Sequence, residues 1–67
     1  MHYTISDEKL AEVTRMFNEQ VDPEPTEEVV KVHLCYDWPE SQEHQDWMDY
    51  ADPQEMVDWL AATFYIY

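Results

Sequence analysis

Apolar positions in the first third of the chain repeat with a helical period. Between about Asp7 and Gln20 they fall three or four residues apart, as they do along one face of an α-helix. Ser6 stands where an N-cap is expected, and acidic residues follow it at the positive end of the helix dipole. The pattern therefore predicts a helix over residues 7–20, with this apolar face: Leu10, Val13, Met16, Phe17 and Val21.

The segment from Val29 to Trp38 follows a different pattern, because apolar or aromatic residues also occur at every second position. These are Val30, Val32, Leu34, Tyr36 and Trp38. Valines and aromatic residues in alternation favour a β-strand. A helix capped at Thr26 is the alternative, since Val30 and Leu34 also fit a four-residue step. A strand needs a partner for its backbone, and residues 2–5 and 63–67 have suitable compositions.

Two further helices are predicted in the second half. Pro39 interrupts the chain before a stretch of roughly residues 41–50, in which His44, Trp47, Met48 and Ala51 share a face. The sequence Asp52-Pro53-Gln54-Glu55 then combines a capping box with proline at the first helical position. The helix that starts there is expected to bury the following residues: Met56, Val57, Leu60, Ala61 and Phe64.

These elements predict an α+β fold in a single domain of residues 1–67, with about three helices packed on a two- to three-stranded sheet. The chain contains no glycine. Tight β-hairpins need residues with positive φ, so this composition disfavours strands joined directly by short turns. An all-α helical bundle is the alternative fold.

Charge is distributed unevenly along the chain. Sixteen acidic residues against three basic ones give a formal net charge of -13, and no lysine or arginine follows Lys31. From residue 37 the carboxylates occur at every third position, and we call this set the acidic row. Its members are Asp37, Glu40, Glu43, Asp46, Asp49, Asp52, Glu55 and Asp58.

The acidic row is the candidate partner-binding surface. On a helix a three-residue step advances about 4.5 Å, which is comparable to the phosphate spacing of about 3.4 Å along one DNA strand. Two aromatic residues within the same stretch, Trp38 and Tyr50, are candidate anchors for a partner's arginines. The alternative is that the row is only the solvated side of two helices. Ordinary solvated helix faces mix both signs of charge, and this one does not.

Other chemistry has little support in the sequence. His33, Cys35 and His44 match no established zinc spacing, so we expect no metal site and no cofactor. No nucleophile motif or phosphate-binding loop is present, which predicts a protein that is not an enzyme. No apolar run approaches the ~20 residues needed to span a bilayer, and the acidic charge opposes direct binding to nucleic acid. A cytoplasmic location is expected, in the host cell if the protein is phage-encoded.

Size, charge and a tryptophan-rich acidic second half together resemble the small phage and mobile-element inhibitors that imitate nucleic acid. That group includes anti-CRISPR proteins and the inhibitors of uracil glycosylase and restriction enzymes. The resemblance is one of character and carries no shared motif. It implies stoichiometric occlusion of a basic nucleic-acid-binding surface on a target protein. The alternative function is a small structural or adaptor subunit, which a homodimer would suit.

Overall fold

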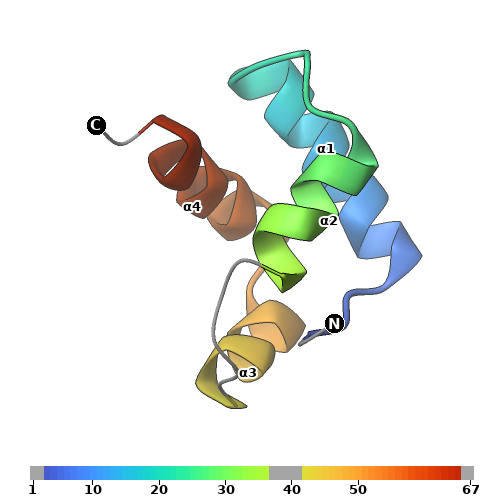
Figure 1. The fold of residues 1–67 in the computed structure, drawn as a ribbon, viewed down its shortest axis with the longest axis vertical. Helices are drawn as coiled ribbons and strands as arrows, with labels where there is room; N and C mark the ends of the chain where they lie inside the picture. Colours follow the sequence, from blue (N-terminus) through green and yellow to red (C-terminus); the bar gives the residue numbers. More distant parts are fainter. Residues whose placement is uncertain (1–2, 37–41, 66–67) are drawn as a thin grey trace.

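The computed structural model describes residues 3–36 and 42–65, and within these ranges every regular element is a helix. The order is α1 (Asp7–Gln20), α2 (Glu27–Cys35), α3 (Gln42–Tyr50) and α4 (Pro53–Tyr65). In Figure 1, α2 lies across α1, α4 runs beside them, and α3 sits apart near the N-terminus. The α+β prediction is therefore wrong, and the all-α alternative fits.

The predicted strand is the helix α2. Its N-cap is Thr26, whose hydroxyl accepts a hydrogen bond from the Val29 amide at 3.4 Å, and Glu27 and Glu28 occupy its first turn. Val30 and Leu34, one turn apart, are fully buried, whereas Val32 lies on the exposed side. The alternating apolar positions of the sequence therefore lie on two different faces of the helix. Capping and burial at a four-residue step outweigh the strand propensity of valine.

The predicted terminal strands are also wrong for the part of the chain that the structure describes. Residues 63–65 continue α4, and residues 3–5 form an extended segment without a strand partner. Tyr3 in that segment is 2% exposed and packs its ring edge-on against His44, with centroids 4.5 Å apart. The N-terminal segment therefore covers α3 and adds no strand.

The other helices begin where the sequence predicts. Ser6 caps α1 by accepting from the Lys9 amide at 3.2 Å, and Asp52 caps α4 by accepting from the Glu55 amide at 2.9 Å. The core joins all four helices, although the side chains of Phe64 and Trp38 lie outside what the structure describes. Its buried apolar residues are Tyr3, Leu10, Val13, Phe17, Val30, Leu34, Cys35, Met48, Ala51, Met56, Val57 and Leu60.

The described helices end without a left-handed residue, because no described residue has a positive φ. Helices often end in a left-handed residue, usually glycine, whose amide satisfies the last carbonyl oxygens. At the ends of α2 and α3, side chains from other elements supply additional donors. The Lys9 ammonium donates to the carbonyl oxygens of Met48 at 2.7 Å and Asp49 at 3.4 Å in the last turn of α3. The His44 ring nitrogen Nε2 lies 3.0 Å from the Leu34 carbonyl oxygen near the end of α2.

Candidate functional site

The described members of the acidic row divide between two helices. Glu43, Asp46 and Asp49 lie on α3, and Asp52, Glu55 and Asp58 lie at or after the start of α4, all six exposed. Each three-residue step turns the side chain by about 60° around its helix axis, so each half of the row winds slowly instead of forming a straight line. Asp37, Glu40 and Trp38 lie outside the described residues.

Three carboxylates of the row are held by glutamine side chains. The amides of Gln42, Gln45 and Gln54 each donate to an aspartate four residues later, at 2.9, 2.9 and 3.1 Å. Their acceptors are Asp46, Asp49 and Asp58. These bonds fix side-chain rotamers as an ion pair would, yet a neutral amide leaves the negative charge in place.

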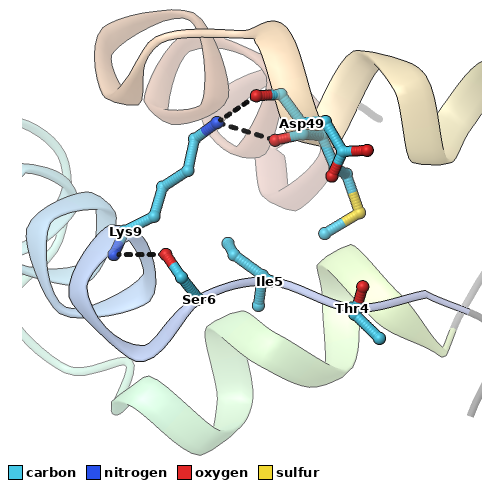
Figure 2. Close-up of a pocket in the computed structure, with 6 residues that line it drawn as sticks. Thr4, Ile5, Ser6, Lys9 and Asp49 are labelled. Carbon is cyan, nitrogen blue, oxygen red and sulfur yellow. Dashed lines mark hydrogen bonds between the residues drawn. The ribbon is translucent and has the colours of Figure 1, made fainter.

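Among the described residues, Lys9 is a cation that contacts α3, and its ammonium donates to backbone carbonyl oxygens. Figure 2 shows its ammonium directed at two carbonyl oxygens of α3, while the Asp49 carboxylate lies to one side. Glu12 lies three residues after Lys9 on the same helix and would be its local partner, but the ammonium reaches across the fold to α3 instead. A cation at the end of a helix also complements the negative pole of its dipole. Lys9 thus stabilises α3 while its ammonium donates to no carboxylate of the row among the described residues.

A hollow of about 450 Å³ lies beside this contact, between the N-terminal segment and α3. Figure 2 shows the residues around it, which are Thr4, Ile5, Ser6, Lys9, Met48 and Asp49. Gln45 ties the two walls together, because its amide donates to the Thr4 carbonyl at 3.1 Å and its oxygen accepts from the Thr4 amide at 2.9 Å. These bonds hold α3 against the N-terminal segment, and the hollow lies between the two.

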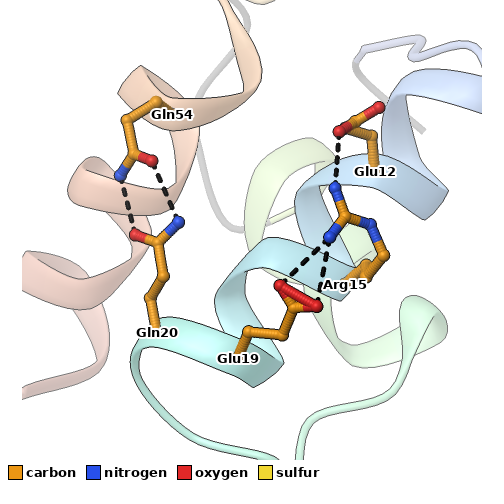
Figure 3. Close-up of polar contacts among 5 residues, drawn as sticks. All are labelled: Glu12, Arg15, Glu19, Gln20 and Gln54. Carbon is orange, nitrogen blue, oxygen red and sulfur yellow. Dashed lines mark hydrogen bonds and ion pairs between the residues drawn. The ribbon is translucent and has the colours of Figure 1, made fainter.

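In α1, by contrast, two acidic residues form ion pairs with a basic side chain. Arg15 donates to Glu12 at 2.8 Å and to Glu19 at 3.0 Å, as Figure 3 shows. The hydrogen bond that Arg15 donates to Glu12, together with the charge of Glu19, raises the pKa of Arg15 above its usual range. A reciprocal pair of amide bonds between Gln20 and Gln54 joins α1 to the start of α4 at 3.0 and 2.9 Å. The neutralised acids of α1 therefore lie on a helix separate from the acidic row.

The aromatic residues of the second half take different positions. Trp47 and Trp59 are half-buried, with ring centroids 5.5 Å apart. Trp47 stacks on the His44 ring, and Trp59 contacts the same ring at a tilt. Tyr50 instead is 87% exposed, directly after Asp49. Of the two predicted aromatic anchors, Tyr50 is therefore accessible to a partner, and Trp38 lies outside the described residues.

His33, Cys35 and His44 carry side chains that can bind zinc. No group of three potential metal ligands occurs among residues 3–36 and 42–65. Cys35 is buried, and this burial raises the pKa of its thiol above 9.0, with the charge of Lys31 acting in the opposite direction. Because a carbonyl oxygen can only accept, the contact with Leu34 places a proton on Nε2 of His44. Both residues have structural roles.

Sequence reasoning missed the three glutamines and the role of Lys9. The glutamines had a readable signal, because each stands four residues before an aspartate on a predicted helix. Lys9 had none, since its acceptors are 39 and 40 residues away in the chain.

Comparison of the chain with protein-family models, curated proteins and solved structures finds no match. Within the described residues, none of the helices combines the length and apolar character needed to cross a membrane.

Proposed function

We propose that this protein inhibits a nucleic-acid-binding protein or complex by occupying its positively charged surface. The observation that carries the proposal is the pairing of row aspartates with neutral glutamine amides at Gln42, Gln45 and Gln54. An ordinary solvated helix gains stability from lysine or arginine at such positions, as α1 does from Arg15. In the acidic row these three carboxylates are oriented by neutral donors, and none of them forms an ion pair with a described lysine or arginine.

Oriented charge suits recognition of a basic surface. Each glutamine occupies one carboxylate oxygen, so the second oxygen remains open to an arginine or lysine of the target. Because these rotamers are already restricted, binding loses less side-chain entropy than it would with free aspartates. The net charge of -13 would speed encounter with a basic target and repel competing nucleic acid.

Tyr50 supplies the apolar part of the contact. A side chain that is 87% exposed between acidic neighbours can stack on an arginine of the target. Charge would then set the association rate, and Tyr50 would slow dissociation. The target is a cytoplasmic nucleic-acid-binding protein, and the inhibitor acts in the same compartment.

The test removes charge while keeping shape. The variant D46N/D49N/D58N preserves an oxygen for each glutamine amide and removes three charges from the row. Its matched control, E8Q/E24Q/E27Q, removes three charges from exposed carboxylates in the first half of the chain. Immobilised wild type, variant and control are each exposed to a lysate of the native host at 0.1 M salt. Retained proteins are then eluted with duplex DNA, RNA or salt.

Wild type and control are expected to retain the same nucleic-acid-binding protein. The row variant should bind it roughly tenfold or more weakly, and raising salt to 1 M should release it because the Debye length falls to about 3 Å. A retained protein that binds duplex simultaneously would overturn the proposal. Equal loss of binding in variant and control would show that total charge matters and the row does not.

A further inference from the structure

The helix α2 exposes an apolar stripe on the side opposite its core contacts. Val29, Val32 and Tyr36 are 41%, 39% and 46% exposed. They follow one another at steps of three and four residues, so they form one continuous face. With the polar residues that border them, they make up what we call the α2 outer face: Glu28, Val29, Lys31, Val32, His33 and Tyr36.

Two shallow hollows lie on this face. One, of about 250 Å³, is lined by Glu28, Val29, Val32 and His33. The other, of about 510 Å³, is lined by Glu28, Lys31, Val32 and Tyr36. Val32 and Glu28 line both hollows, so the two depressions adjoin at these residues. A surface with two adjoining hollows can receive side chains from another helix.

The charge of the α2 outer face differs from that of the acidic row. Glu28 and Lys31 lie three residues apart on the same flank. Lys31 forms no ion pair with any residue that the structure describes, whereas Arg15 and Lys9 are engaged elsewhere. This flank therefore carries one charge of each sign within an apolar surface. Such a surface is complementary to itself when turned by a two-fold rotation.

We propose that a second copy of this chain docks on the α2 outer face, with the two α2 helices antiparallel. A two-fold axis near the midpoint of Val29 and Val32 brings each of these valines against the other valine of the second copy. The same rotation places Glu28 near the second copy's Lys31, and the pair forms twice. The described members of the acidic row lie on α3, on α4 and at Asp52, and none of them belongs to the α2 outer face.

Two opposing effects set the strength of this dimer. One face of a nine-residue helix offers less than the ~800 Å² that each partner contributes to a standard interface, so the dimer is weak. Each copy also carries a charge of -13, which repels the other. Salt screens this repulsion, because the Debye length falls from about 10 Å at 0.1 M to about 3 Å at 1 M. Self-association should therefore strengthen with salt, opposite to the binding of a basic target.

Sedimentation equilibrium up to millimolar protein tests the proposal at both salt concentrations. The dimer dissociation constant is expected to be roughly tenfold lower in 1 M salt than in 0.1 M. V32S should abolish the dimer, and Y50S, which removes an exposed aromatic residue outside the face, should leave it intact. Circular dichroism checks that both variants fold. A protein that stays monomeric throughout in 1 M salt, or a V32S variant that still dimerises, overturns the proposal.

A charge exchange tests the orientation. E28K and K31E each place two like charges on the flank, so each alone should dimerise more weakly than the same concentration of their mixture. In the mixture, unlike charges meet at both ends of the interface. E8K alters the net charge as E28K does without touching this face, and mixing it with K31E should give no such gain. A mixture of E28K and K31E that associates no better than either variant alone contradicts the antiparallel arrangement.

Discussion

The first helix and the α3–α4 segment orient their carboxylates with the same local geometry but with different donors. In α1 the donor is Arg15, which holds Glu12 and Glu19 and cancels part of their charge. In α3 and α4 the donors are glutamines, which hold aspartates four residues away and cancel none. Orienting a carboxylate and neutralising it are therefore separate operations. The chain performs both in one region and only the first in the other.

The largest expected effect comes from breaking the hydrogen bonds by which Lys9 of α1 contacts α3, the strongest cationic contact between these regions among the described residues. K9M removes a charged donor from the Met48 and Asp49 carbonyl oxygens at the end of α3. Hydrogen bonds to charged groups are worth about 2 kcal/mol, so the free energy of unfolding should fall by about that amount. Denaturant titration measures the loss, and amide hydrogen exchange should show faster opening in α3 than in α1.

K31M is the control for that experiment. It removes the same charge and the same kind of side chain, but Lys31 donates no hydrogen bond to a described residue. Its effect on unfolding should be much smaller. If K9M and K31M destabilise the protein equally, the loss reflects the change in net charge, and the contact with α3 contributes nothing.

An intermediate effect is expected from replacing neutral donors of the acidic row by cations like the one in α1. The variant Q42K/Q54K places a cation four residues before Asp46 and Asp58 and leaves Gln45 on Thr4, but it breaks the bonds between Gln54 and Gln20. The control Q42A/Q54A breaks the same bonds without adding cations. Such cation–carboxylate pairs add about 0.2–0.5 kcal/mol each, so at low salt Q42K/Q54K should be up to about 1 kcal/mol more stable than Q42A/Q54A, while its binding to the target weakens. A stability gain unchanged at 1 M salt would exclude an electrostatic cause.

The smallest effect is expected from the reverse exchange. R15Q gives α1 a neutral donor like those of the acidic row, between Glu12 and Glu19. Exposed ion pairs contribute little to stability, so the melting temperature should fall slightly at 0.1 M salt and match wild type at 1 M. Binding to the basic target should be unchanged, because the acidic row is intact. Stronger binding by R15Q would show that α1 belongs to the binding surface.

Local signals in the sequence were enough to place three of the helices. Ser6 and Asp52 cap α1 and α4 as predicted, and Met48 and Ala51 are buried on the predicted face of α3. These signals involve residues a few positions apart. The prediction was wrong for α2, because a run of valines satisfies both a two-residue and a four-residue period. The Thr26 cap favours the helix, but the burial of Val30 and Leu34 against the other helices completes the choice, and that burial is a property of the whole fold.

The candidate site was predictable to a similar degree. The exposure of six row carboxylates follows from their spacing, and the glutamine pairs could have been found at four-residue steps. The contact of Lys9 with α3 depends on how helices far apart in the sequence pack together. Nothing within a few residues of Lys9 distinguishes it from a lysine paired with Glu12. Its position therefore had to come from the structure.

The absence of glycine affects how the chain can be divided. A helix that ends in its own left-handed residue carries its stop signal within its own segment. Here the last turns of α2 and α3 are completed by His44 and Lys9, which belong to other segments. A peptide containing only α2 or only α3 would lack its terminating donor and should fray. Truncated fragments are consequently poor substitutes for the whole chain. A substitution of Lys9 in α1 should affect the end of α3, and a substitution of His44 in α3 should affect the end of α2.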